Sequence, residues 1–174
     1  MSESLPVDPQ LSDAFRESMR VMANSVVMVT TWFEGKPWGL TVSACCSVSA
    51  TPPLLLVSIG AHTITAQAIR ASRRFGVNIL SEKQVELAQF GARPREPKFC
   101  QQHCDCSSES PERAPVIQDC IAHFCCRVER EILAADHVIF IGAVENARRS
   151  VTGRPLLHYE RQFHKLGEEP LHVP

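Results

Sequence analysis

The sequence lacks any apolar run long enough to cross a membrane. The longest, around residues 54–59, has the length of one β-strand, whereas a spanning helix needs about 20 residues. The first ten residues, MSESLPVDPQ, are acidic and polar, which is not the pattern of a secretory signal. We therefore expect a cytoplasmic protein with no membrane segment.

The sequence also lacks an excess of charge of either sign. Its 18 lysines and arginines are balanced by 19 aspartates and glutamates. Nucleic-acid-binding domains usually carry a broad basic surface, so we expect no nucleic-acid partner. The 174 residues, 44% of them hydrophobic, suffice for one ordinary globular domain.

The common nucleotide and hydrolase motifs are missing as well. There is no GxGxxG turn, no GxxxxGK[ST] loop, no GxSxG nucleophile motif and no HExxH pair. A nucleotide would therefore have to be held by a different arrangement of residues.

What is present predicts a domain over residues 11–167, between a flexible N-terminal segment (1–10) and a C-terminal tail (168–174). Apolar residues at three- and four-residue spacing predict a helix over 11–23, and two more helices are expected over 63–72 and from a Ser81 cap to residue 90. Strands are expected over 25–33, 38–46, 54–58 (fully buried), 75–80, 122–129, 138–144, 156–159 and 162–166. Because strand follows strand with tight turns, we predict a mainly β protein, a closed antiparallel barrel with peripheral helices.

Eight cysteines are many for this length, and we expect them to be free thiols. Three of them lie in the region 91–115, which shows no periodicity and is predicted to be a loop. Cys100, His103, Cys104 and Cys106 offer sulfur and nitrogen ligands that zinc accepts. Their spacing matches no usual zinc motif, so we favour a mobile loop with free thiols and expect no metal site.

Small hydroxyl residues are concentrated between residues 39 and 53, in GLTVSACCSVSATPP. On one strand, the even spacing of Thr41, Ser43, Ser47 and Ser49 would place them on one face. Hydroxyls beside free backbone N–H groups suit a phosphate or the polar edge of a heterocycle. The same pattern also fits the solvent face of an edge strand, and spacing alone leaves both interpretations open.

Five segments in order resemble the flavin reductase-like, FMN-binding split-barrel family. They are FRESMRVMANSVVMVTT, GLTVSACCSVSATPPLLLVSI, FGVNILSEKQVELAQF, ADHVIFIGAV and PLLHYERQFHKL, spanning residues 15–166. The resemblance implies a six-stranded Greek-key split barrel with two or three flanking helices, and a homodimer with FMN or FAD near its interface. It further implies a flavin reductase that takes electrons from NADH or NADPH and supplies reduced flavin to a partner flavin-dependent monooxygenase.

The resemblance also implies roles for individual residues. The flavin would be lined by Thr41, Ser43, Ala44, Cys45, Cys46, Ser47 and Ser49. His62 and Thr63, at a helix start, would approach its phosphate. Asn78 would fix the barrel beside the flavin, and Tyr159 is the closing aromatic. His137 matches a histidine near the stacked nicotinamide and flavin, where it would orient the reactants.

Two alternatives belong to other functional classes. A barrel of this kind could be a non-catalytic carrier or sensor of flavin or haem, because a fold alone does not determine activity. A pure interaction module is disfavoured, since it would leave the hydroxyl segment and His137 without a purpose. The remaining polar residues are expected on the surface: His123, His158 and His164 on strands, and Arg148, Arg149 and Arg154 in a solvated turn that could also hold a nicotinamide phosphate.

Overall fold

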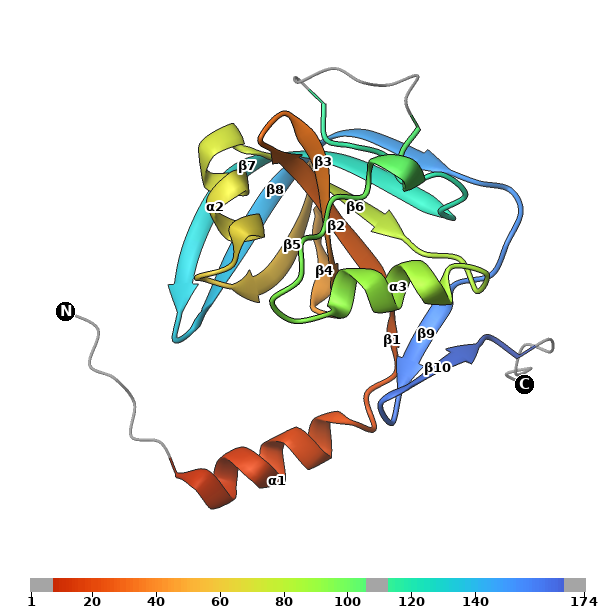
Figure 1. The fold of residues 1–174 in the computed structure, drawn as a ribbon. Helices are drawn as coiled ribbons and strands as arrows, with labels where there is room; N and C mark the ends of the chain where they lie inside the picture. Colours follow the sequence, from red (N-terminus) through yellow and green to blue (C-terminus); the bar gives the residue numbers. More distant parts are fainter. Residues whose placement is uncertain (1–7, 106–112, 168–174) are drawn as a thin grey trace.

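The computed structural model describes residues 8–105 and 113–167 and shows a mainly β protein, as predicted (Figure 1). Its helices are α1 (Pro9–Met19), α2 (Ile64–Ser72), α3 (Val85–Ala92) and the short 3-10 helix η1 (Gln101–His103). Its strands are β1 (Asn24–Ser25), β2 (Val27–Phe33), β3 (Lys36–Val42), β4 (Cys45–Ala50), β5 (Pro53–Gly60), β6 (Arg74–Ile79), β7 (Ala122–Ala134), β8 (His137–Arg149), β9 (Leu156–Tyr159) and β10 (Gln162–Lys165).

The main sheet is closed by a link of two residues. Its seven strands are ordered β3-β2-β6-β7-β8-β5-β4, so that β3 and β4, its two outermost strands, are neighbours in the chain. Only Ser43 and Ala44 separate them, and such a link spans at most about 11 Å between the flanking Cα atoms. The sheet must therefore curl until its edges meet, and the Ser58 N–H of β5 donates to Ala44 O at 3.0 Å, which holds the link against β5.

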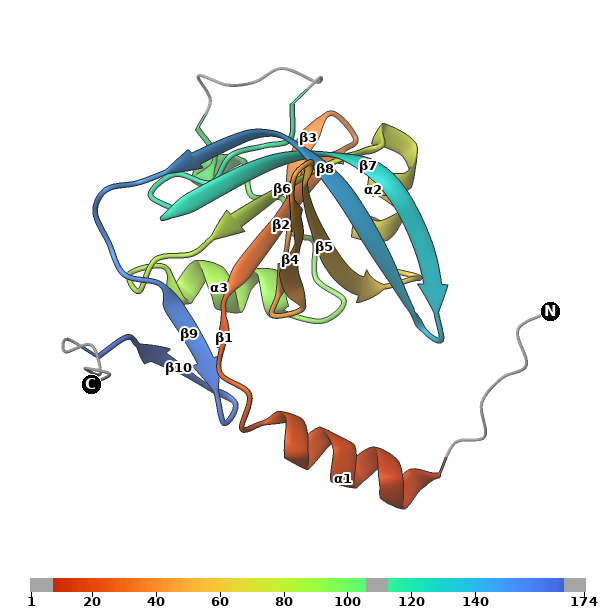
Figure 2. The same cartoon turned by 180° about the vertical axis from the view of Figure 1, so that it is seen from behind.

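This closure corrects one sequence prediction. The single strand expected over residues 38–46 is wrong, because the chain leaves one edge of the sheet after Val42 and enters the other at Cys45. The main sheet consequently has seven strands where the family resemblance implied six. A separate three-stranded sheet, β1-β9-β10, lies below the barrel in Figure 2.

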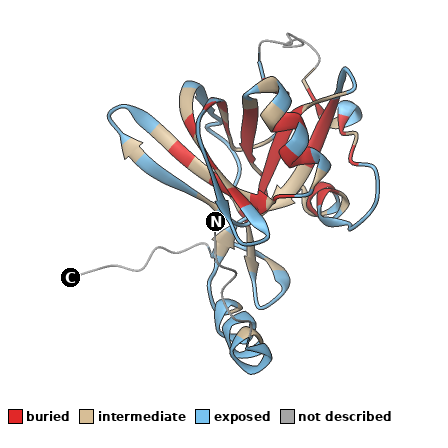
Figure 3. Ribbon diagram, turned by 90° about the vertical axis from the view of Figure 1, so that its left-hand side faces the viewer, coloured by how far each residue is buried: buried red, intermediate tan, exposed pale blue. Residues whose placement is uncertain are grey.

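The barrel interior is the main core, as the buried strands in Figure 3 show. Phe75 and Phe140 are fully buried in it, with ring centroids 6.5 Å apart. Along β5 buried residues alternate with half-buried ones, so the expectation of a fully buried strand is wrong. Because β5 lies in the barrel wall, only one of its faces points into the core.

A second core lies outside the barrel, where α3 packs against β3. Gly91 permits the close approach, since a Cβ there would lie 2.7 Å from Met28 Cε and 3.0 Å from Thr41 N. The predicted Ser81 cap is wrong, because α3 begins at Val85 and the Ser81 N–H donates to Gln84 Oε1 at 2.9 Å.

Helix α1 stands away from the barrel (Figures 1 and 2) and has no buried residue. Asp8 caps it by accepting from the Gln10 N–H, and the helix begins at Pro9, before the predicted residue 11. It also ends at Met19, short of the predicted residue 23. The remaining predicted terminal segments, 1–7 and 168–174, lie outside the described residues. Within the described part, no helix has the length and hydropathy of a membrane span.

Replacing Gly91 with alanine should destabilise the protein by about 1–3 kcal/mol, because the new methyl group would push α3 away from Met28 and Thr41. Urea unfolding measures the change. Gly167→Ala is the matched control, since a Cβ there meets no atom within 4 Å. Equal stability of the two variants would contradict the close packing of α3 on β3.

Candidate functional site

The hydroxyl segment lines a cavity of about 490 Å³ at one end of the barrel, which we call the barrel-mouth pocket. Its rim comes from the segment around β4, and its floor from inward side chains of the barrel. The rim residues are Ser43, Cys45, Cys46, Ser47 and Ser49, and the floor includes Val27, Val77, Ile79, Phe124 and Val144. An apolar cavity of this size with a few polar groups is typical of small-molecule sites.

The rim offers hydrogen-bonding groups to a ligand. Among the described strands β4 pairs only with β5, so the backbone groups on its other edge are left unpaired by the sheet. The Ser43 and Ser47 hydroxyls make no hydrogen bond to another described residue, whereas Ser49 Oγ accepts from the Thr51 N–H at 3.1 Å. A bulge between Ser47 and Ser49 interrupts the register with β5. The predicted single strand is therefore interrupted, at the link of Ser43 and Ala44 and at this bulge, although Ser43, Ser47 and Ser49 still line one pocket.

Two predicted members of the flavin lining do not line this pocket. Thr41 Oγ1 is buried, has no hydrogen-bond partner in the described part, and lies toward Gly91 of α3. Ala44 lies in the link between β3 and β4, and its carbonyl accepts from the Ser58 N–H of β5.

His62 and Thr63 line a second cavity of about 570 Å³, which we call the aromatic cavity. It lies between α2, the β2–β3 hairpin and the segment 95–99; its rings are Phe33, Trp38 and Phe99. Thr63, which was predicted as the first helical residue, is the N-cap of α2: its Oγ1 accepts from the Ala66 N–H at 3.1 Å and donates to Gly60 O at 2.8 Å.

His137 lies at the start of β8, beside Gly60 in the sheet register and so next to the turn that leads into α2. Its side chain is 51% exposed and lines neither cavity. Its Nδ1 lies 2.8 Å from Asp136 Oδ1, and this hydrogen bond lowers the pKa of the Asp136 carboxyl. The Asp136 carbonyl accepts from the Ala61 N–H at 2.9 Å, which fixes the β7–β8 hairpin against the same turn.

Tyr159 lies on β9, in the small sheet, with its ring edge-on to His164 at 5.8 Å between centroids. Strand β9 pairs with β1, where Asn24 and Ser25 line the barrel-mouth pocket. The structure therefore places Tyr159 on an element beside that pocket, with its side chain outside the lining.

Asn78 is fully buried and uses its whole amide inside the protein. Its Nδ2 donates to Met28 O and Thr30 Oγ1 at 3.1 Å, and its Oδ1 accepts from the Ile117 N–H at 2.9 Å and lies 2.9 Å from His123 Nδ1. These contacts join β2, β6 and β7 to the segment that precedes β7. The amide is thereby a structural cross-link with no group left for a ligand.

His123 corrects a prediction, because it is 4% exposed and not a surface residue. The face of β7 that carries it is covered by the segment around Ile117, whose position the strand pattern does not reveal. Burial, with a smaller contribution from Arg148, lowers the pKa of His123 to about 4. Arg148 and Arg149 also differ from prediction: they belong to β8 and line a small cavity beside His123, whereas a turn was expected.

Two cysteines of the predicted loop belong to the second core. Cys100 and Cys104 are buried in the second core, with their sulfur atoms 3.7 Å apart. Cys106 lies outside the described residues. Among the residues that are described, no three histidine, cysteine or acidic side chains are grouped to hold a metal ion.

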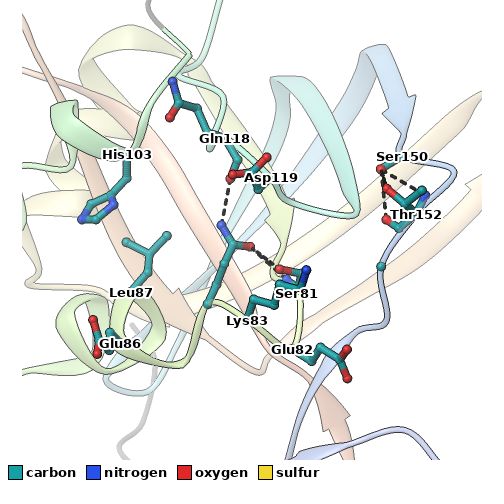
Figure 4. A pocket seen from close by; sticks show the side chains of 12 residues that line it. Ser81, Glu82, Lys83, Glu86, Leu87, His103, Gln118, Asp119, Ser150 and Thr152 are labelled. Carbon is teal, nitrogen blue, oxygen red and sulfur yellow. Dashed lines mark hydrogen bonds between the residues drawn. The ribbon is translucent and has the colours of Figure 1, made fainter.

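A further cavity, of about 560 Å³, lies near the start of α3 (Figure 4). Gln84 spans it, donating from Nε2 to Gln118 O at 2.8 Å and accepting from Ser81. None of the residues assigned by the family resemblance lies in it. Its acidic and basic side chains are mixed, so its chemistry does not favour one class of ligand.

Comparison with known proteins identifies the family. Residues 19–167 match the model described as "Flavin reductase like domain". The chain belongs to the flavin reductase family. It is 35% identical over 149 residues to the reductase component of 4-nitrophenol 4-monooxygenase/4-nitrocatechol 2-monooxygenase of Rhodococcus opacus, covering 86% of this chain and 78% of that protein. It is 36% identical to a flavin reductase (NADH) of Kitasatospora aureofaciens, covering 92% of this chain and 86% of the relative.

Solved structures of flavin reductases share the fold. The flavin reductase PheA2 superposes with a TM-score of 0.79 at 33% identity, covering 93% of this chain and 100% of the other. The NADH:FAD oxidoreductase SgcE6 of Streptomyces globisporus superposes with a TM-score of 0.82 at 27% identity, covering 96% of this chain and 100% of the other. The family, the split-barrel fold and the assignment to the flavin reductases, all predicted from the sequence, are thus confirmed.

The low pKa of His123 predicts a stability that depends on pH. The folded protein keeps His123 neutral, whereas the unfolded chain binds a proton below its ordinary pKa of 6.5. Stability should therefore fall as the pH decreases from about 6.5 toward 4. The urea midpoint of His123→Gln should fall less steeply over this range than that of the wild type. The control is His164→Gln, which alters an exposed histidine on β10; its urea midpoint should change with pH as that of the wild type does. If the urea midpoint of His123→Gln also fell as steeply as that of the wild type, the prediction would be contradicted.

Proposed function

We propose that this flavin reductase transfers hydride from NADH or NADPH to FMN or FAD held along residues 41–49. The observation that carries the proposal is the barrel-mouth pocket, with its apolar floor and its rim of serine hydroxyls and edge-strand backbone groups. A flavin ring has an apolar body and a polar edge, so the donor set and the floor fit this group. In this proposal Cys45 and Cys46 form the wall beside the ring.

A flavin held there would supply the hydride acceptor for the dihydronicotinamide, which is the redox chemistry of the reaction. The residues of the chain have to position the reactants and exclude water, and no nucleophile is needed. Ser43 and Ser47 would orient the polar edge. His62 and Thr63, at the N-terminus of α2, would stabilise a phosphate through its partial positive charge.

His137 is proposed to orient the nicotinamide. Its Nδ1 faces the Asp136 carboxylate, which favours a proton on that nitrogen and leaves Nε2 to meet a ligand. Tyr159 is proposed to close the flavin site from the small sheet. Asn78, which faces away from the barrel interior, is proposed to support the wall beside the site through its bonds to β2 and β7.

We further propose a homodimer in which α1 packs on a second copy. Leu11 and Phe15, on one face of α1, are 67% and 62% exposed, and an apolar helix face of this kind favours a protein interface. A partner monooxygenase is proposed because the Rhodococcus relative is named as a reductase component. A cytoplasmic location is supported by the seven free cysteines in the described part of the chain.

An anaerobic titration tests the function. Purified protein with bound FMN or FAD should lose its visible flavin absorbance when NADH or NADPH is added, in proportion to the nicotinamide consumed. A flavin or haem carrier would keep its spectrum unchanged, and that outcome would refute the reductase proposal.

Replacing His137 with alanine should reduce the rate of flavin reduction or raise the KM for the nicotinamide by about tenfold, the effect of one lost hydrogen bond. Stopped-flow reduction measures both, and the affinity for flavin should stay unchanged. His164→Ala serves as control because it alters another exposed histidine. Wild-type kinetics in His137→Ala would remove this residue from the mechanism.

A further inference from the structure

Two thiols of the second core lie in contact and have no part in the proposed flavin site. Cys100 Sγ and Cys104 Sγ are 3.7 Å apart, and no other pair of described cysteines shares a hydrogen bond. We propose that hydrogen peroxide oxidises this dithiol reversibly to a disulfide, and that the pair thereby protects the second core from permanent oxidation. The source of the peroxide rests on the proposed function, whereas the site itself does not.

The short helix η1 brings the two sulfur atoms together. It forms a single turn, in which the His103 N–H donates to Cys100 O at 2.9 Å and the Cys104 N–H donates to Gln101 O at 3.1 Å. A disulfide has a sulfur separation of about 2.05 Å, so the thiols have to approach each other by about 1.7 Å. Rotation of the two side chains can supply a movement of this size.

Both ends of the turn are attached to other parts of the protein. The Cys100 N–H donates to Pro37 O of β3 at 3.0 Å, and the Asp105 N–H donates to Val116 O at 2.9 Å. Cys100 also packs against β3, since a Cβ on Gly39 would lie 3.2 Å from its sulfur. The backbone is thus held from two sides, which keeps the two sulfur atoms next to each other.

The dithiol is buried beneath a surface turn. Gln101 and Gln102, between the two cysteines, are exposed, whereas Cys104 is 3% exposed and Cys100 is fully buried. A 3-10 helix of three residues has weak hydrogen bonds, so it opens locally at low cost. Hydrogen peroxide is small and uncharged, and a brief opening is sufficient to admit it. We expect it to reach Cys104 first.

The proposed reaction balances with peroxide as the only oxidant. The Cys104 sulfur attacks one peroxide oxygen and the O–O bond breaks, giving a sulfenic acid and one water. The Cys100 sulfur then displaces the sulfenic oxygen, which leaves as a second water while the S–S bond forms. The two thiol protons end in the two waters, the sulfur atoms are oxidised by two electrons in total, and the peroxide is reduced.

A flavin reductase is exposed to this oxidant because of its own product. Reduced flavin that escapes a partner passes two electrons and two protons to dioxygen and gives hydrogen peroxide. A buried thiol without a neighbour would be oxidised onward to sulfinic or sulfonic acid, which thiols do not reverse. Such a charged group would disrupt the packing of α3 on β3. The second thiol prevents this, because it converts the sulfenic acid to a disulfide that thiols reduce.

Peroxide treatment of the wild type and Cys120→Ala tests the inference. Each protein is treated without nicotinamide, denatured and alkylated, and its peptides are identified by mass spectrometry. In the wild type, Cys100 and Cys104 should lose their alkylation together, as one disulfide that dithiothreitol reduces completely. Cys120→Ala is the matched control, because Cys120 is half-buried against the same core, and it should form the same disulfide.

Cys100→Ala removes the thiol that resolves the sulfenic acid. After peroxide, its Cys104 should be found as sulfinic or sulfonic acid, and its urea midpoint should stay below the untreated value even after dithiothreitol. The wild type should regain its untreated midpoint. Circular dichroism before treatment confirms that the variant is folded, and the wild-type peptides decide the outcome without any variant.

A further arm tests the source of the oxidant. Turnover with NADH, FMN and dioxygen should form the same disulfide, and catalase should prevent it. If added peroxide forms the disulfide but turnover does not, reduced flavin is refuted as the source. Folded protein that forms the disulfide with added peroxide but does not oxidise NADH would contradict the proposed function and leave the dithiol site intact.

Three results would overturn the inference. The first is a wild type that keeps both thiols after peroxide treatment. The second is a disulfide that joins Cys104 to Cys106 or Cys120 in place of Cys100. The third is Cys100→Ala that recovers from peroxide as fully as the wild type does.

Discussion

The architecture depends on the link between β3 and β4. Because Ser43 and Ala44 alone connect the two edges of the sheet, the sheet must close, and the bond from the Ser58 N–H to Ala44 O holds this link against β5. β4 is thereby positioned as an edge strand at the end of a barrel. Its serines and its backbone groups could not otherwise stand beside an apolar floor.

The same closure explains why two cavities lie close together. Leu40 and Ser43 belong to one short stretch of chain, yet they line different cavities because the chain passes from one sheet edge to the other between them. Strand β5 then leads past Gly60 into α2, and Gly60 pairs with His137. Three segments distant in sequence therefore meet around the closure.

Sequence patterns predicted what depends on local periodicity and on the family motifs. The capped helix α2 and strand β6 agree with the structure to within about a residue, because their signals lie within the elements themselves. The break between Val42 and Cys45 was missed, since hydroxyl spacing looks the same in one strand as in two. The burial of His123 was missed because it depends on the segment around Ile117, which is bonded to Asn78, the hydrogen-bond partner of His123. When a strand residue is buried by a segment outside its own strand, the residues next to it in the sequence do not indicate the burial.

The central claim is that flavin lies along the rim formed by β4, and hydrogen–deuterium exchange with and without FMN or FAD tests it most directly. Bound flavin should slow exchange of amides in residues 43–49, whose outer edge the sheet leaves unpaired. The peptide that contains Ser81 and Gln84, at the cavity of Figure 4, should exchange at an unchanged rate. Protection of that peptide, with none in residues 43–49, would contradict the account.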